Sequence, residues 1–216
     1  NKAKILELGS GTGRIAESLL GLDINYTGLD LSSEYTLYAN NKFNKHDNFN
    51  FVQGDMSCFS LNQKYDIIFI AFNSFLHLLK YDDAIKCLAA ISTHMHSKSR
   101  LIIDIFVPHP LFLYRPENLK MHIVDFYNKA EKEEQEINEI LNYDSDTEIA
   151  NVQWIYSNEK NKNLYTFKFM MKMYYPETMH FLFENSNLKI LDYWGDYDRS
   201  KFNEDSNLQI YSCRLH

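Results

Sequence analysis

Short apolar runs and helical stripes alternate along the first half of the chain. Ile5, Leu6 and Leu8 form an apolar run, as expected of a strand buried on both faces. The next apolar side chains repeat with helical spacing, at Ile15, Ala16, Leu19 and Leu20. Further strands are expected at residues 25–30, 50–53, 64–70 and 99–106, and helices at residues 33–44 and 82–95. Strands that alternate with helices in this way predict a mostly parallel sheet covered on both faces.

The alternation stops between residues 107 and 175. Residues 129–141 are acidic and are expected to be helical, whereas residues 150–156 and 163–174 have the pattern of two strands joined by a polar turn. In the second strand one face carries Tyr165, Phe167, Phe169, Met171 and Met173, and the other carries Thr166, Lys168 and Lys172. This period of two predicts an antiparallel hairpin with one face in water.

The last part of the chain returns to the first pattern. A helix is expected at residues 176–185, because Pro176 suits a first helical turn, and strands are expected at residues 188–194 and 207–214. We therefore predict a core of residues 1–106 and 176–216, with residues 107–175 inserted as a lid or substrate subdomain.

A glycine loop joins the first strand to the first helix. Gly9, Gly11 and Gly13 follow Glu7 at every second position, and Arg14 stands where the dinucleotide fingerprint G-x-G-x-x-G has its third glycine. The order acid-x-G-x-G-x-G resembles the first motif of the class I S-adenosylmethionine-dependent methyltransferases. The alternative is an ordinary strand-turn-helix whose glycines serve only the turn.

Residues 71–77, A-F-N-S-F-L-H, refine the resemblance. They lack the N/D-P-P-Y motif of methyltransferases that act on exocyclic amines of bases or on glutamine. They are instead similar to small-molecule methyltransferases, including amino-sugar and glycine N-methyltransferases. The resemblance implies a Rossmann-like, mostly parallel α/β sheet of seven strands in the order 3-2-1-4-5-7-6, with the last strand antiparallel. It also implies S-adenosyl-L-methionine as cofactor, with S-adenosyl-L-homocysteine as product, and N- or O-methylation of a small molecule.

Asp30 is placed at the carboxyl end of the second strand, where an acid can accept hydrogen bonds from a ribose. The alternative is a helix cap, a role that Ser32 also fits. The resemblance assigns Asp55 and Met56 to the adenine, against the alternative of a polar turn, and Phe72 to the cofactor wall. The full set of expected cofactor-binding residues is Glu7, Gly9, Ser10, Gly11, Gly13, Asp30, Leu31, Asp55, Met56, Phe72 and Asn73.

Methyl transfer needs a general base only if the acceptor must lose a proton. His77 is the first candidate by position, followed by His109 and Tyr114 after the fifth strand, and each could instead be a surface or pocket-lining residue. The other histidines show no ligand spacing, so we expect no metal.

Composition narrows the classes of partner and cellular compartment that the sequence allows. The chain has 216 residues and a net charge of −7, and residues 125–149 hold nine acids and two lysines. Without a basic stripe, nucleic acid is a poor candidate partner. No apolar run has membrane-spanning length, no signal peptide opens the chain, and the three cysteines are far apart without C-x-x-C, so we expect a reduced, cytoplasmic protein.

Three functions are compared. The first is a small-molecule methyltransferase, the second a nicotinamide-dependent oxidoreductase, and the third a non-catalytic binding protein with a cofactor fold. Arg14 counts against the second, and the intact glycine loop with Asp30 and Asp55 counts against the third. The oligomeric state stays open, with a homodimer as one candidate. Because the chain begins at Asn1 rather than Met, we also expect a preceding segment.

Overall fold

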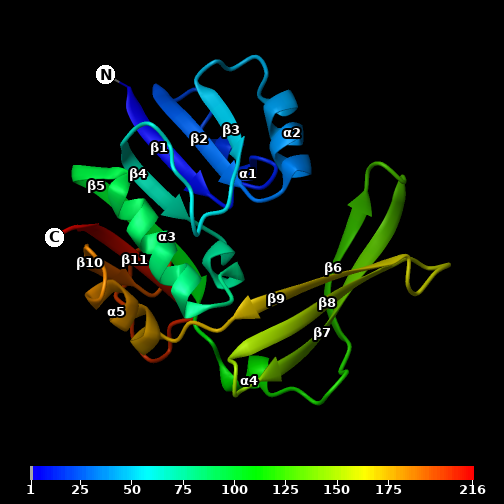
Figure 1. The fold of residues 1–216 in the computed structure, drawn as a ribbon. Coiled ribbons are helices and arrows are strands. Elements are labelled where there is room, and N and C mark those ends of the chain that lie inside the picture. The colour runs from blue at the N-terminus through cyan, green and yellow to red at the C-terminus, as the bar shows by residue number, and fades with distance from the viewer. Residues whose placement is uncertain (1) are drawn as a thin grey trace. The chain divides into compact units, whose positions relative to one another are not determined.

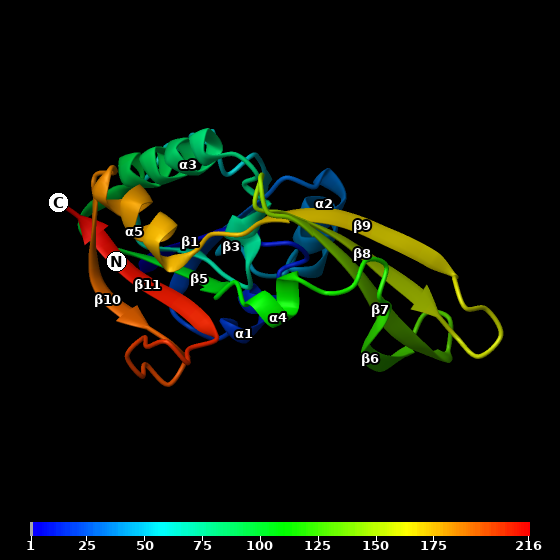
Figure 2. The ribbon, with the colours of Figure 1, turned by 90° about the horizontal axis from the view of Figure 1, so that it is seen from below.

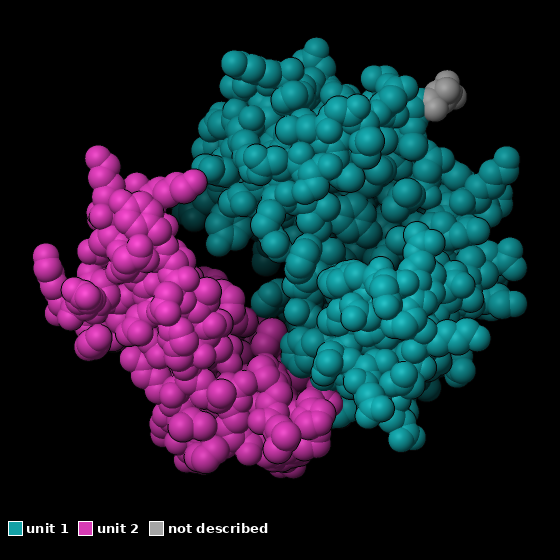
Figure 3. Space-filling model, turned by 180° about the vertical axis from the view of Figure 1, so that it is seen from behind, with its two compact units in different colours: residues 1–107, 174–216 teal, residues 108–173 magenta. Residues whose placement is uncertain are grey.

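The computed structural model describes residues 2–216, which cluster into two compact units. The first comprises the chain up to Val107 together with Tyr174–His216, and the second comprises Pro108–Met173, as coloured in Figure 3. Each unit has its own sheet.

The first unit is built on a seven-stranded sheet (Figure 1). Its strands are β1(Ala3–Leu8), β2(Ile24–Asp30), β3(Phe49–Gln53), β4(Tyr65–Ile70), β5(Met95–Phe106), β10(Leu188–Trp194) and β11(Leu208–Leu215). They lie in the order β3-β2-β1-β4-β5-β11-β10. β11 is antiparallel to both β5 and β10, whereas the pairs among β1 to β5 are parallel. The predicted order 3-2-1-4-5-7-6 with an antiparallel last strand is confirmed.

Helices cover this sheet on both sides, and Figure 2 shows α1 and α3 on opposite sides of it. The helices are α1(Arg14–Ser18), α2(Ser33–Lys42), α3(Tyr81–Thr93) and α5(Pro176–Glu184), with a 3-10 turn at Ser74–His77. α2 packs on β2 and β3, α3 on β5, and α5 on β10.

The core lies in the central strands. Leu6, Leu8, Ile68 and Ile70 have no exposed surface, which agrees with the apolar runs in the sequence. Because buried side chains in a protein core are closely packed, those of neighbouring strands fix one another's positions. The carboxyl ends of β1 and β4 are therefore rigid points from which the loops of the site begin.

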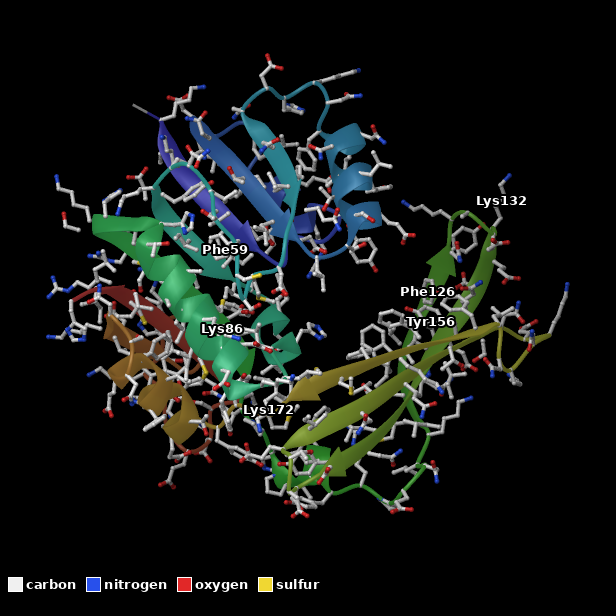
Figure 4. The ribbon with its side chains drawn as sticks, viewed as in Figure 1. Phe59, Lys86, Phe126, Lys132, Tyr156 and Lys172 are labelled. Atoms are coloured by element: carbon white, nitrogen blue, oxygen red, sulfur yellow. The ribbon has the colours of Figure 1, made fainter. Side chains whose placement is uncertain are left out.

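The second unit is a four-stranded antiparallel sheet with one short helix. The elements are α4(Pro110–Leu113), β6(Met121–Asn128), β7(Glu133–Asp144), β8(Ile149–Ser157) and β9(Tyr165–Lys172), and the strands lie in that order. Figure 4 labels Phe126 of β6 and Tyr156 of β8, whose rings meet edge to face at 6.2 Å.

One expectation for this unit is wrong, and one strand was missed. Residues 129–141 are not a helix, because most of them form β7, and β6 was not expected at all. The acids of β7 have cross-strand partners: Ser157 Oγ donates to Glu136, and Trp154 Nε1 donates to Glu139. Tertiary pairing here overrides the local helical pattern.

The face of β9 that was expected to lie in water is also partly buried. Lys172 is 5% exposed, and its Nζ donates to Thr147 O at 2.7 Å and lies 3.0 Å from Glu148. On the other face Tyr165 is 52% exposed. Burial in β9 therefore changes along the strand as well as between its faces.

All three cysteines are free, Cys58 on the surface and Cys87 and Cys213 in the interior. None of the helices among residues 2–216 has the length and hydropathy needed to cross a bilayer.

Candidate functional site

The glycine loop leaves β1 in a conformation that side chains rarely adopt. Gly9 and Gly13 have φ values of 78° and 77°. A Cβ atom at Gly9 would lie 2.8 Å from the Ser74 side chain, and one at Gly13 would lie 2.8 Å from the ring of Phe43. Both positions therefore require glycine for their backbone angle and for space.

The same loop has two features of a ligand cradle. A Cβ atom at Gly11 would meet no atom within 4 Å, so the main chain there borders open space. Ser10 Oγ is buried and has no hydrogen-bond partner among residues 2–216. An orphaned polar atom beside an open main chain fits a polar ligand with donors and acceptors of its own. The loop thus fits the amino-acid end of S-adenosylmethionine.

Asp30 ties the loop to the end of β2. Its Oδ2 accepts the Gly11 N–H at 2.7 Å, and its Oδ1 accepts the Ser32 N–H at 2.9 Å. Ser32 is the residue that caps α2, because its Oγ accepts the Tyr35 N–H at 3.2 Å. Asp30 therefore shapes the loop, and its oxygens keep further lone pairs for other hydrogen-bond donors.

Glu7 lies beneath the loop at 3% exposure and accepts a hydrogen bond from the Tyr26 hydroxyl. Burial raises the pKa of Glu7 to about 7, and the Tyr26 hydrogen bond and the Arg14 charge oppose that shift. A carboxyl with this pKa changes charge near neutral pH.

The turn after β4 contributes a strained segment. Phe72 and Asn73 have φ values of 52° and 66°, in the left-handed region. The Phe72 ring is 52% exposed and lies under Arg14, whereas Asn73 Oδ1 accepts the Phe106 N–H at 2.8 Å. The amide oxygen of Asn73 thus holds β5.

The turn after β3 meets the end of β2. The Gly54 N–H donates to Asp30 O at 2.9 Å. Asp55 is exposed, with Oδ1 accepting the Ser57 N–H at 2.7 Å, and Met56 is half-buried. Leu31 is 71% exposed at the same edge.

Two cavities border this edge of the sheet. One, of about 390 Å³, is lined by the glycine loop with Glu7, Arg14, Tyr35, Phe72 and Ser74. The other, of about 450 Å³, is mostly apolar and is lined by strand side chains with Arg14, Phe72, Asp104 and Tyr197. Arg14 and Phe72 belong to both walls.

The structure brings only part of the expected set together around the first cavity. Its walls include Glu7, Gly9, Ser10, Gly11 and Phe72. The remaining expected residues lie outside its lining, namely Gly13, Asp30, Leu31, Asp55, Met56 and Asn73. Sequence reasoning missed Tyr35, Ser74, Asp104 and Tyr197 as cavity residues, and it read Arg14 only as a departure from a fingerprint.

The three candidate bases are divided between the two units. His77 is exposed at the end of the 3-10 turn in the first unit. His109 and Tyr114 belong to the second unit, where His109 Nδ1 accepts the Leu111 N–H at 3.1 Å and thereby caps α4. The Tyr114 ring meets Tyr143 edge to face at 5.5 Å.

In the second unit, one candidate ligand atom from each of His122, Asp125 and Glu136 lies within 4.8 Å of the others. Lys162 Nζ also lies 4.0 Å from Glu136, so a positive charge already faces this carboxylate. Asp125 and His122 are exposed.

The chain is similar to known methyltransferases. The family described as "Methyltransferase domain" matches residues 5–98. The Bacillus subtilis (strain 168) protein "Putative methyltransferase YqeM" is 28% identical over 105 residues, which span 48% of this chain and 42% of that protein. The chain thus covers less than half the length of this curated relative.

Solved structures share the fold over nearly the whole chain. An S-adenosylmethionine-dependent methyltransferase from Clostridium acetobutylicum ATCC 824 aligns with a TM-score of 0.83 at 21% identity, over 98% of this chain and 83% of that one. The CcbJ methyltransferase from Streptomyces caelestis gives 0.86 at 21%, over 99% and 83%. CalS10, an amino pentose methyltransferase from Micromonospora echinaspora with S-adenosylmethionine bound, gives 0.74 at 14%, over 100% and 84%. These comparisons do not favour the nicotinamide-dependent alternative.

Proposed function

We propose that the chain transfers a methyl group from S-adenosylmethionine to a small-molecule acceptor, because the methyltransferase-domain family matches residues 5–98 and solved methyltransferases share the fold. The observation that carries the proposal is the cradle of open main chain at Gly11 beside the buried, unpartnered Ser10 Oγ. The cofactor supplies an activated methyl group on a sulfonium, so the protein acts mainly by positioning.

Each part of the cradle has a role in this proposal. Asp30 accepts hydrogen bonds from the ribose hydroxyls while it holds the Gly11 N–H. Asp55 and Met56 contact the adenine. Arg14 offers a positive charge to the carboxylate at the amino-acid end, because it is one of the residues that line the glycine-loop cavity.

For the acceptor we propose an amine or hydroxyl on a sugar-like small molecule. Support comes from CalS10, the amino pentose methyltransferase, and from KedS8, a sugar N-methyltransferase whose structure aligns with a TM-score of 0.72. An amine that arrives protonated must lose a proton before it attacks the methyl group. His77 is our candidate for the group that takes this proton.

Calorimetry with S-adenosylhomocysteine and with NADH tests the cofactor assignment. We expect binding of the first at micromolar concentration and none of the second; the reverse result contradicts the proposal. Transfer of a labelled methyl group to a panel of amino sugars and their deoxy analogues then tests the activity. Cofactor binding without transfer to any metabolite of a cell extract would favour a non-catalytic binding protein.

His77→Gln tests the proton acceptor. We expect the variant to bind S-adenosylhomocysteine as the unchanged chain does but to lose kcat at neutral pH, with partial recovery at higher pH as more of the acceptor amine loses its proton unaided. The same test on His109→Gln and Tyr114→Phe ranks the other two candidates. An unchanged kcat in His77→Gln removes it from this role.

We also propose that residues 107–175 form the acceptor-binding insertion. The chain leaves the core after β5, at the carboxyl edge of a parallel sheet, where open α/β folds bind ligands. Within the insertion, Tyr165 stacks on Tyr156 at 4.1 Å and remains 52% exposed, as an aromatic platform for a ring-shaped ligand would be.

Tyr165→Ala and Tyr127→Ala form a matched pair for this proposal. Both tyrosines are 52% exposed, and the strand register places them on opposite faces of the sheet. We expect Tyr165→Ala to raise the KM for the acceptor without changing the affinity for S-adenosylhomocysteine, and Tyr127→Ala to change neither. Equal effects of the two substitutions contradict the platform.

A further inference from the structure

The turn after β4 needs a restraint. Phe72 and Asn73 are consecutive residues with side chains, and both have positive φ. Left-handed backbone is unfavourable for such residues, and bulky Phe72 is an especially uncommon occupant. Residues in this conformation persist only where their surroundings hold them there.

The restraint comes from β5, and Asp104 supplies most of it. Asp104 Oδ1 accepts the Phe72 N–H at 2.5 Å, and the main-chain oxygen of Asp104 accepts the Asn73 N–H at 3.3 Å. One residue thus takes both main-chain donors of the strained pair. The Phe106 N–H closes the link from β5 back to Asn73 Oδ1.

A distant tyrosine fixes the carboxylate itself. The Tyr197 hydroxyl, on the segment between β10 and β11, donates to Asp104 Oδ2 at 2.6 Å. Asp104 is 7% exposed, and each of its carboxylate oxygens has a hydrogen-bond partner. Hydrogen bonds to a charged acceptor in such surroundings are among the stronger ones in proteins.

Phe72 of the strained pair is part of the wall of the glycine-loop cavity, whereas Asp104 is not. Asp104 and Tyr197 line only the apolar cavity, which shares Arg14 and Phe72 with the glycine-loop cavity. We propose that Asp104, held by Tyr197, is a positioning residue that sets cofactor affinity by holding Phe72 and Asn73 in their left-handed conformation. The effect on cofactor affinity rests on the proposed function, whereas the restraint on Phe72 and Asn73 rests on the structure alone.

Three variants and one control variant test the proposal by calorimetry with S-adenosylhomocysteine. Asp104→Leu removes both acceptor oxygens, and we expect affinity to fall by about tenfold or more. Asp104→Asn keeps an oxygen for the Phe72 N–H, and its amide can donate to the Tyr197 oxygen, so affinity stays within about threefold. Tyr197→Phe frees one carboxylate oxygen and should weaken binding by about threefold or more.

Asp66→Leu is the control for loss of a carboxylate with similar hydrogen-bond partners. Asp66 lies near the start of β4, at the opposite edge of the sheet, and likewise accepts one main-chain N–H, from Lys4 at 2.7 Å, and one side-chain group, His96. We expect its affinity for S-adenosylhomocysteine to match the unchanged chain. Because the Asp66 side chain is 46% exposed and Asp104 is 7% exposed, urea denaturation of both Leu variants measures the stability that each loses. A positioning role lowers the affinity of Asp104→Leu under conditions in which that variant is folded, whereas a stability effect alone leaves the affinity of the folded protein unchanged.

The amide NMR signal of Phe72 gives a readout that does not depend on the cofactor. A hydrogen bond to a carboxylate moves an amide proton downfield, so this signal should lose that shift in Asp104→Leu and keep most of it in Asp104→Asn. Absence of S-adenosylhomocysteine binding by the unchanged chain contradicts the proposed function, and the NMR signal still decides whether Asp104 holds the turn. If Asp104→Leu does not fold, Tyr197→Phe decides. Unchanged affinity and an unchanged Phe72 signal in that variant overturn the inference.

Discussion

The guanidinium carbon of Arg14 lies 4.1 Å from the centroid of the Phe72 ring. Arg14 is the first residue of α1 and Phe72 belongs to the turn after β4, so this contact joins the glycine loop to the strained turn. Both residues line both cavities. This contact therefore links the position of the Arg14 charge to the position of the Phe72 ring in the walls of both cavities.

Arg14→Met keeps an aliphatic stem but removes the charge, and we expect it to weaken S-adenosylhomocysteine binding by about 1–2 kcal/mol. The loss should shrink between about 50 mM and about 500 mM salt, because salt screens the attraction in the unchanged chain. Calorimetry at both salt concentrations measures it. Arg100→Met is the control, since the Arg100 guanidinium donates to Ser99 O and lines neither cavity. Equal affinities of the two variants would contradict a charge role for Arg14.

Asp30→Ala should weaken S-adenosylhomocysteine binding by about 1–3 kcal/mol or more. The variant loses the proposed ribose hydrogen bonds and also leaves the Gly11 N–H without its acceptor. Asp23→Ala removes an acid just before the start of β2, at the other end of that strand from Asp30, whose side chain is 82% exposed, and should leave affinity unchanged. An unchanged affinity in Asp30→Ala contradicts the assignment.

Glu7 makes stability depend on pH. Its pKa is raised from 4.5 to about 7 in the folded chain, so between these values the folded state binds more protons than the unfolded state. The stabilisation is complete below the unfolded value and is lost as pH rises through about 7. Relative to Glu7→Gln, the unchanged chain should lose up to about 3 kcal/mol of unfolding free energy from pH ~5 to ~8.

Urea denaturation across that pH range measures this difference. Tyr26→Phe supplies a second check, because the Tyr26 hydrogen bond lowers the pKa of Glu7. Its removal should shift the loss of stability to higher pH. A pH-independent difference between the unchanged chain and Glu7→Gln would show that burial does not control this carboxyl.

Gly13→Ala and Gly21→Ala separate backbone strain from crowding. Both glycines have positive φ, at 77° and 88°. An added Cβ at Gly13 would lie 2.8 Å from Phe43 and 3.0 Å from Phe51, whereas one at Gly21 would meet no atom within 4 Å. Gly13→Ala should therefore destabilise the chain by about 1–3 kcal/mol more than Gly21→Ala. Equal midpoints in urea would mean that the two phenylalanines move aside freely.

The sheet could be predicted because its signal is local. Buried runs such as Leu6–Leu8 and Ile68–Ile70 have few alternatives to a central strand, and the glycine loop fixes the first turn. Residues 129–141 misled the same reasoning, because their acids suit an exposed helix until Ser157 and Trp154 supply partners across the sheet.

The site was less predictable for a related reason. Tyr197 and Asp104 are 93 positions apart, and nothing in either local pattern marks the hydrogen bond between them. Phe72 and Asn73 likewise give no sign in the sequence of their left-handed backbone, since glycine is absent there. Loop motifs reveal residues that contact a ligand through the main chain, whereas supporting side chains become visible only in three dimensions.

Gln209 gives the insertion a clear boundary. Its Nε2 donates to Phe106 O at 3.1 Å and to Tyr174 O at 2.7 Å, at the two points where the chain leaves the core and returns to it. The core thus joins its own ends with one buried amide, whatever segment connects them. Under the proposed function, the segment that would bind the acceptor can therefore be replaced or shortened without removing the hydrogen bonds that hold the ends of the cofactor-binding core.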